Sequence, residues 1–409
     1  MGKKTQTETH AVLRGDLLVF LLSGCFFGPA NAHVSERALV LLLPTDIYIR
    51  AGTAAVAISF IILLAAPPAL IRRVFSSWAM PALPRKNVIA DVISLCSTAF
   101  LFLAIWVGFT GTGDPTVNML PLLIWSVWWI PMPVIQAVFG DVWRMLNPWS
   151  GVARLIAPGQ PLVQLPKGLG AWPAVIIFAA FSVFHIADIA PSDPTRLAKT
   201  VLCYWTITLA ARVIFGPEWM KRGEAFSVLF HQFARLAPIT NGRIGVPGHD
   251  LLAAGSVSMA TGVLTISMLA AGSFDGLKGS FWWLGNIGIN PLEFPGRSAV
   301  VWPNALAVLA SIVVLAVIFH ALTVAGLRLV KAPFSLANRL ALAVLPIALG
   351  YHMAHYLTAF MVDIQYALGA LTDPLARGDD WLRLGKHHVT TGFFNSPDSV
   401  RMIWLAQAS

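Results

Sequence analysis

The chain has 409 residues, of which 57% are hydrophobic and only 11% are charged, and its mean hydropathy is +0.72. This composition excludes an ordinary soluble domain and predicts an all-α, polytopic transmembrane helix bundle. A net charge of +9 would suggest a nucleic-acid partner in a soluble protein. Here the basic residues fall in loops on one side of the predicted membrane, so we expect a lipid bilayer as partner and no nucleic acid.

The N-terminus has the features of a signal segment. Basic residues precede the apolar run Leu17–Gly28, and a small-x-small pattern ends at Ala32. Cleavage there would leave His33 first in the mature chain, where its α-amine and imidazole could bind a metal such as copper. Leu22–Cys25 also resembles a lipoprotein box with Cys25 acylated, and an uncleaved anchor is the third alternative. We predict a signal at 1–32 and a single transmembrane helical domain at 33–409.

Apolar stretches of membrane-spanning length then follow one another along the chain. Each is near the length needed for about 30 Å of hydrocarbon. With the processed N-terminus outside, every basic loop falls in the cytoplasm, so we expect a multi-pass protein of a bacterial inner membrane. The predicted spans number eight: Asp46–Leu70, Val88–Gly108, Met119–Phe139, Ala171–Ala190, Leu197–Phe215, Leu251–Ala271, Val301–Leu329 and Leu340–Leu371.

A further helix is predicted at the end of the sequence, where Ser396–Gln407 has the pattern of a cap and two or more turns. It is too short to cross a bilayer. We expect an incomplete or interfacial last helix, or one that a second polypeptide completes.

The last span carries ionisable residues inside an apolar sequence. His355 lies about 60° from His352 around the helix and Asp363 about 20° from it on the other side, so the three share one face. Such groups usually pair, bind a metal or line a wet cavity. The alternative is that both histidines hydrogen-bond to neighbouring helices. Leu345-Pro346 could break this helix one turn before His352.

His185 and Asp188 form a second polar pair, three residues apart near the outer end of the fourth span. If the fourth and eighth spans touch, this pair would meet His355 and Asp363 in one cavity open to the periplasm. Such a set suits zinc, manganese or iron. Asp275, just outside the sixth predicted span, is a third candidate carboxylate, although its neighbours would also fit a tight turn.

Several motif classes are missing from the sequence. There is no Gly-x-Ser-x-Gly, no phosphate-binding glycine-rich loop and no Cys-x-x-Cys. A serine nucleophile and a nucleotide-driven pump are therefore disfavoured.

Four stretches carry a resemblance to a known family: Ala32-His33, Gly140–Trp149, Arg222–Phe226 and Ser273–Leu277. Through them the chain resembles a family of bacterial membrane proteins called fenitrothion hydrolase-like, over essentially its whole length. The resemblance implies hydrolysis of an aryl organophosphorus triester, a small apolar substrate. Family members look as if they continue through a complete last helix, from which this sequence departs at Ser409.

Two functions follow as expectations. In a membrane-embedded, metal-dependent hydrolase, a divalent ion would activate water, with Asp363 and Asp188 as catalytic carboxylates. The predicted ligands are His352, His355, His185, Asp363, Asp188 and His33. The alternative is a protein that transports or handles copper, another cation or protons through the same histidines. A purely structural role for these side chains is the third interpretation.

Overall fold

The computed structural model describes residues 45–408, apart from 81–86, 158, 160, 254, 256, 294–295, 384–388, 391 and 393–395. The predicted signal at 1–32, with Cys25 and the candidate ligand His33, lies outside the described residues.

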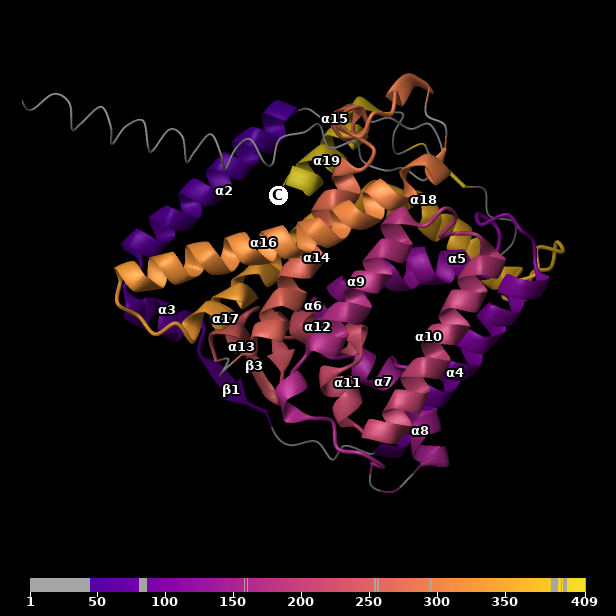
Figure 1. Ribbon diagram of the computed structural model, residues 1–409, viewed down its shortest axis with the longest axis horizontal. Coiled ribbons are helices and arrows are strands. Elements are labelled where there is room, and N and C mark those ends of the chain that lie inside the picture. Colours follow the sequence, from indigo (N-terminus) through magenta and orange to yellow (C-terminus); the bar gives the residue numbers. More distant parts are fainter. Residues whose placement is uncertain are drawn as a thin grey trace, which may run out of the picture.

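The described chain is mainly helical and has very little strand, which confirms the all-α prediction (Figure 1). The longest helices are α2 (Thr45–Ala65), α4 (Asn87–Thr110), α9 (Trp172–Ala187), α10 (Pro194–Phe215), α14 (Met259–Leu277), α16 (Val301–Leu329) and α18 (Val344–Thr372). The shorter α-helices are α3 (Pro68–Val74), α5 (Met119–Pro121), α6 (Met132–Phe139), α7 (Trp143–Leu146), α8 (Ser150–Ile156), α11 (Glu218–Arg222), α12 (Ala225–Ala234), α13 (His249–Leu252), α15 (Phe281–Asn286), α17 (Leu336–Leu340) and α19 (Pro397–Ala408).

Other regular structure is limited in the described chain. Strands β1 (Ser77–Ala79), β3 (Arg243–Gly245) and β2 (Ile239–Thr240) form a small antiparallel sheet in that order. A π-helix, η1, covers Leu122–Trp129. The 3₁₀ turns are η2 (Lys167–Leu169), η3 (Pro291–Glu293), η4 (Arg297–Val300) and η5 (Ala341–Ala343).

Six stretches of the described chain are long and apolar enough to cross a membrane, fewer than the eight that the sequence predicted: Val88–Thr110, Met119–Phe139, Pro194–Phe215, Met259–Leu277, Arg297–Leu329 and Leu336–Thr372. The first and fourth predicted spans correspond to shorter apolar stretches, Ile49–Ile62 and Trp172–Ala187. Helix α2 ends at Ala65, just before Pro67 and Pro68. Neither proline has a backbone N–H, so neither can donate the hydrogen bond that would extend the helix. Helix α9 ends where Asp188 becomes extended.

The sixth span is shifted along the sequence from its predicted position. It was expected at Leu251–Ala271, but α14 begins only at Met259, where the Ser258 hydroxyl caps the helix by accepting from Thr261 N–H. It then continues to Leu277. Asp275, which the sequence placed in an outer turn, therefore lies inside the last turns of a buried helix.

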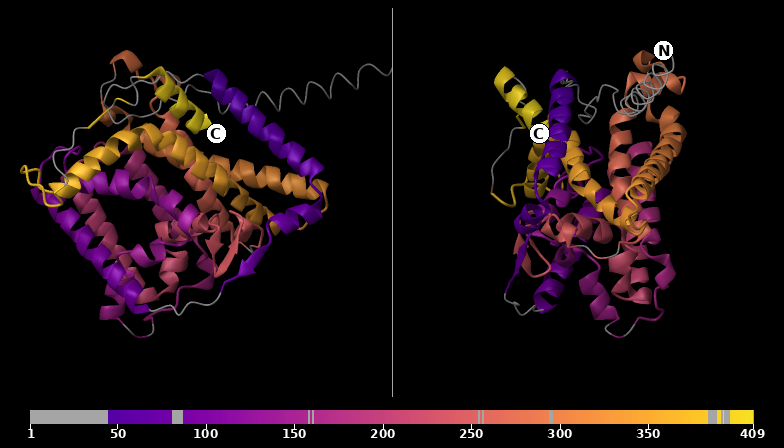
Figure 2. Two further views of the ribbon diagram at one scale, coloured as in Figure 1. Left: turned by 180° about the vertical axis from the view of Figure 1, so that it is seen from behind. Right: turned by 90° about the vertical axis from the view of Figure 1, so that its left-hand side faces the viewer.

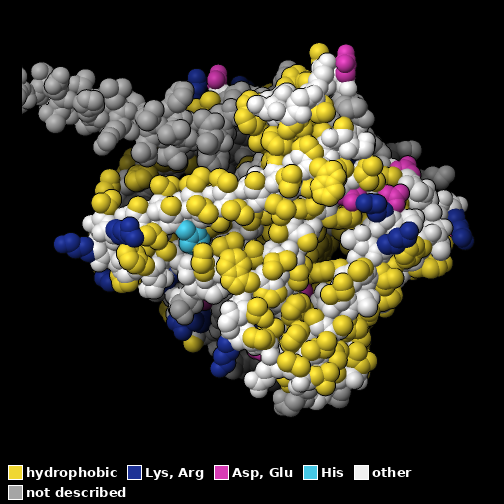
Figure 3. Space-filling view, viewed as in Figure 1, with side chains coloured by type: hydrophobic (Ala, Val, Ile, Leu, Met, Phe, Trp, Pro, Cys, Tyr) yellow, Lys and Arg dark blue, Asp and Glu magenta, His cyan; other side chains and the backbone are white. Residues whose placement is uncertain are grey.

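Helix α14 is the centre of the bundle. It packs against α9, α16 and α18, and most of its side chains are buried (Figure 1). Helices α4 and α10 pack together at one edge, while α2 lies at the opposite edge (Figures 1 and 2). Hydrophobic side chains cover the face over α16 and its neighbours, and charged side chains gather toward the margins (Figure 3). This distribution is the one expected for a bundle surrounded by lipid.

The third span is irregular next to the centre of the bundle. The π-helix η1 is followed by a turn at Ile130 and Pro131, and α6 starts at Met132 with Pro133 in its first turn. Proline has no N–H, so the Trp129 carbonyl four residues before Pro133 loses its α-helical donor. By contrast, α18 continues unbroken from Val344 through His352, so the break that the sequence suggested near Pro346 is absent.

Helix α12 is held by a fully buried carboxylate. Glu224 caps it by accepting from the N–H groups of Phe226 and Ser227, at 2.9 and 2.6 Å, and it also accepts from the Tyr204 hydroxyl of α10. We expect Glu224→Ala to lower the free energy of unfolding by about 2–4 kcal/mol, because it removes a cap and takes away the acceptor of the Tyr204 hydroxyl. Unfolding in mixed micelles would measure this loss. A change below about 0.5 kcal/mol, typical of exposed sites, would contradict it.

Candidate functional site

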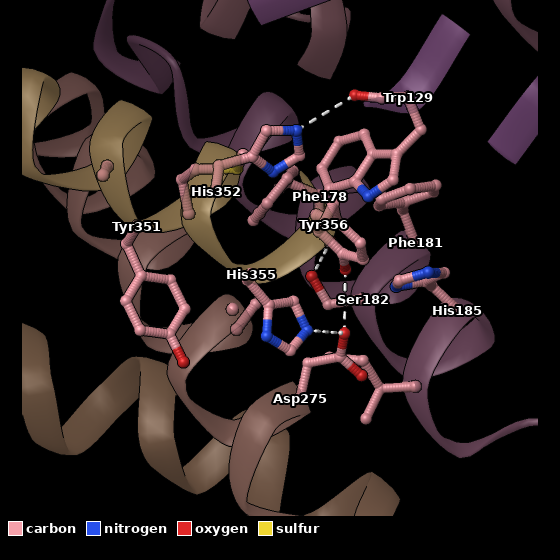
Figure 4. Close-up of a pocket in the computed structure, with 15 residues that line it drawn as sticks. Trp129, Phe178, Phe181, Ser182, His185, Asp275, Tyr351, His352, His355 and Tyr356 are labelled. Carbon is pink, nitrogen blue, oxygen red and sulfur yellow. Dashed lines mark hydrogen bonds and ion pairs between the residues drawn. The ribbon is translucent and has the colours of Figure 1, made fainter. Parts of the chain in front are cut away.

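A small cavity lies where α9, α14, α18 and the irregular third span meet (Figure 4). The volume that the centre of a water molecule can occupy in it is about 20 Å³. That space suits one water molecule or one small ion. Aromatic and polar side chains share the lining, which includes Trp129, Phe181, His185, Asp275, His355 and Tyr356.

Asp275 is the hub of this site. Its Oδ2 accepts from His355 Nε2 at 3.0 Å and from the Tyr356 hydroxyl at 2.8 Å, and its Oδ1 lies 2.6 Å from Lys278 Nζ (Figure 4). The side chains of Asp275 and His355 are only 4% and 6% exposed, and that of Lys278 is 14% exposed. A buried charge in an apolar bundle is tolerated when it is paired and hydrogen-bonded in this way.

The helical geometry explains why these groups converge. Asp275 lies in the last turn of α14 and Lys278 caps the end of that helix three residues later, a spacing that brings the two side chains together. Gly276 also lies on α14, and a Cβ atom there would come within 2.9 Å of the Tyr351 hydroxyl. The absence of a side chain lets Tyr351 approach, and its ring stacks on His355 with centroids 5.8 Å apart. The imidazole is thus held between an aromatic ring and a carboxylate.

One ring nitrogen of His355, Nε2, is hydrogen-bonded to Asp275, and the other, Nδ1, is not. An ionised carboxylate can only accept, so Nε2 carries the proton that is donated to Asp275. Nδ1 is then the basic nitrogen of the neutral ring. The Asp275 carboxylate would also stabilise the ring after it gained a second proton.

His352 has a different role from His355. Its Nε2 donates to the carbonyl oxygens of Trp129 and Ile130, at 3.2 and 3.1 Å. It thereby supplies the donor that Pro133 cannot give to the Trp129 carbonyl. Since His352 is only 3% exposed, the hydrogen bond is buried, and this histidine fastens the broken third span to α18.

His185 faces the same cavity from α9 (Figure 4). Its ring stacks on Phe181, with centroids 5.8 Å apart and planes 2° apart, and lies 6.3 Å from the Tyr356 ring. The fourth and eighth predicted spans, α9 and α18, thus contact each other through these side chains. Helix α14 packs against both of them.

Asp188 is directed away from the cavity. Its carboxylate forms a two-pronged ion pair with Arg196, at 2.7 and 2.6 Å, and its backbone oxygen accepts from Arg297. Burial by itself would raise the pKa of Asp188, but the hydrogen bonds from Arg196 and the Ala190 N–H outweigh it and lower the pKa. Asp188 is therefore a charged partner that fixes the end of α9.

Asp363 is also outside the lining of the cavity. It shares a face of α18 with His355, as predicted, but eight residues of α-helix separate them by about 12 Å along the axis. A common face is not sufficient for two side chains to reach a common ion.

The predicted metal ligands that the structure describes do not all meet at one point. Among the described residues, no three His, Cys, Asp or Glu side chains form a group that could hold a metal ion. Asp188 and Asp363 lie elsewhere, and His352 Nε2 and His355 Nε2 already donate to oxygen atoms. Binding of a zinc, manganese, iron or copper ion stays a prediction from the sequence.

Comparisons with known proteins do not add a family to this description. No protein-family model, curated protein or solved structure matches the chain.

Sequence reasoning missed the centre of the site. Asp275 was considered only as a loop carboxylate because the sixth span was placed too early, and Lys278 and Tyr356 were not candidates. One signal was present: Asp275 and Lys278 have the i, i+3 spacing of an ion pair on a helix. The end of an apolar run is where such a pair can be buried.

Proposed function

We propose that this chain is a membrane transport protein that binds and releases a proton at the Asp275–His355 pair. The observation that carries this proposal is the buried Asp275 carboxylate, which accepts hydrogen bonds from His355 and Tyr356 of α18 and is ion-paired with Lys278, beside a cavity of single-water size. Ionisable groups inside a membrane bundle are rare, and chains of Asp, Glu and His side chains form the proton relays of pumps and transporters.

We propose a route for the proton within this arrangement. His355 Nδ1 accepts a proton, while Nε2 keeps its hydrogen bond to Asp275 and the carboxylate stabilises the new positive charge. His185, whose ring lies across the cavity, is the second imidazole of the described residues there that is not bonded to the third span.

The irregular third span supports transport as the function. Transporters place their sites near discontinuous helices, where non-helical backbone lines a cavity. The η1 segment and the turn at Pro131 provide such a discontinuity, and Trp129 at its end lines the cavity. We place the protein in the inner membrane of a bacterium with the cavity toward the periplasmic side, on the distribution of basic loops.

A second candidate function is hydrolysis of a small apolar ester, such as an aryl organophosphorus triester. One observation favours it: a histidine oriented by a buried carboxylate is the arrangement of a general base. Asp275 and His355 would then be the acid–base pair, with no metal. The cavity would have to open for such a substrate, because about 20 Å³ holds only a species the size of water.

One experiment separates the two functions. The full chain is reconstituted into liposomes that contain a pH-sensitive dye, and a pH gradient is imposed with valinomycin present to balance charge. If the protein transports protons, the dye should report more acidification of the liposome interior than in protein-free liposomes. No nitrophenol should then be released from an aryl phosphotriester. Nitrophenol release without proton movement would replace the transport proposal with hydrolysis.

A further inference from the structure

The inner end of α10 carries a buried cation that no described carboxylate neutralises. Arg212, one turn before the end of the helix, is only 8% exposed. Its Nε has no hydrogen-bond acceptor among the described residues. The charged side chain that acts on this guanidinium is another cation, Arg154. A buried guanidinium without an acceptor carries a desolvation cost that a bound anion would offset.

Arg154 approaches from α8, which lies beside the last turns of α10 (Figure 1). It forms an ion pair with Asp91 of α4, and its side chain is 42% exposed. Asp91 thus pairs with Arg154, while no described carboxylate forms an ion pair with Arg212. The local charge remains positive, in a position that solvent or a lipid headgroup can reach through Arg154.

The surroundings place this pair at the level of lipid headgroups. Leu155 and Ile156, directly after Arg154, are 69% and 60% exposed, and Leu162 is 75% exposed. The segment that contains Leu162 folds against the end of α10, where Val163 N–H donates to the Ile214 carbonyl at 3.0 Å. Exposed aliphatic side chains beside paired arginines are typical of sites that hold a phosphate while acyl chains lie alongside.

We propose that Arg212 and Arg154 together bind a phosphate group at this end of the bundle. The guanidinium fork matches two phosphate oxygens, and its hydrogen bonds to an anion are charge-assisted. The phosphate is that of an anionic lipid or a free phosphate ion. The site is independent of the cavity around Asp275.

The full chain, purified in neutral detergent, is titrated with phosphatidylglycerol, phosphatidylcholine and inorganic phosphate, and bound ligand is counted by native mass spectrometry. We expect phosphatidylglycerol to bind in preference to phosphatidylcholine. Arg212→Gln should weaken it by about tenfold, the loss expected for one charge-assisted hydrogen bond. The matched control is Lys221→Gln, which removes one exposed charge, paired with Glu218, and should leave the affinity unchanged.

Two further measurements complete the test. If inorganic phosphate binds and Arg212→Gln weakens its binding to the same extent, the ligand is free phosphate, and the proposed phosphate site is supported. Arg154→Gln changes an exposed side chain and should also weaken binding, which keeps the test valid if Arg212→Gln fails to fold. Binding of both ligands that is unaffected by Arg154→Gln and Arg212→Gln, or that falls equally in Lys221→Gln, would overturn the proposal.

Discussion

Asp275→Asn should lower the free energy of unfolding by about 3–5 kcal/mol, the cost of leaving one member of a buried ion pair without its partner. The substitution keeps the shape of the side chain but removes the charge that Lys278 Nζ faces at 2.6 Å. Tyr356 and His355 would still find an oxygen, so the loss would come mainly from the uncompensated ammonium group. Unfolding of the detergent-solubilised protein by sodium dodecyl sulfate would measure it.

A double substitution tests the reason for this loss. Lys278→Met removes the ammonium group and retains a flexible apolar chain, so Asp275→Asn with Lys278→Met should lose much less stability than the two single changes added together. Proton movement should stay lost in the double variant, since Asp275 is still absent. A cost below about 1 kcal/mol for Asp275→Asn alone would show that the pair behaves as an exposed one, contrary to its burial.

The two histidines of the last span should respond differently to the same substitution. His355→Gln should reduce proton movement by about a hundredfold, the lower end of what a positioned acid–base group contributes, because glutamine can hydrogen-bond to Asp275 but cannot titrate. His352→Gln should retain movement, since an amide N–H can still donate to the Trp129 and Ile130 carbonyls. Flux into liposomes, measured for both variants, makes the comparison.

His352→Ala completes this pair of predictions. It leaves two buried carbonyls without their donor and opens a small void, so we expect a loss of about 2–4 kcal/mol in stability. Residual flux per folded molecule should stay near that of the unmodified protein. If His352→Gln abolished flux as fully as His355→Gln, the division into a structural and a titrating histidine would be wrong.

Much of the fold could be predicted from hydropathy alone. Long apolar runs such as Val88–Gly108 and Val301–Leu329 closely match helices α4 and α16, because a bilayer admits little else than helices. The start of α14 could not be predicted as well. The residues before Met259 are nearly as apolar as the helix itself, so hydropathy does not show where the helix begins. Its first residue is set by the Ser258 cap.

The site was predicted in part. Helical periodicity placed His352 and His355 on an inward face, and His185 was correctly expected to share a cavity with His355. Periodicity carries no information about tertiary partners, however. It did not show that Arg196 binds Asp188 or that Pro133 frees a carbonyl for His352. Because the sixth span was predicted too early in the sequence, Asp275 was a candidate only as a carboxylate in a loop, although it is the residue around which the site is built.

The most direct test of this account is proton movement into liposomes by Asp275→Asn beside Asp363→Asn. Both changes remove one carboxylate charge from a helix of the bundle, but only Asp275 lines the cavity. The account predicts that Asp363→Asn acidifies the liposome interior as the unmodified protein does, while Asp275→Asn does not exceed protein-free liposomes. Equal acidification by Asp275→Asn and the unmodified protein would contradict it.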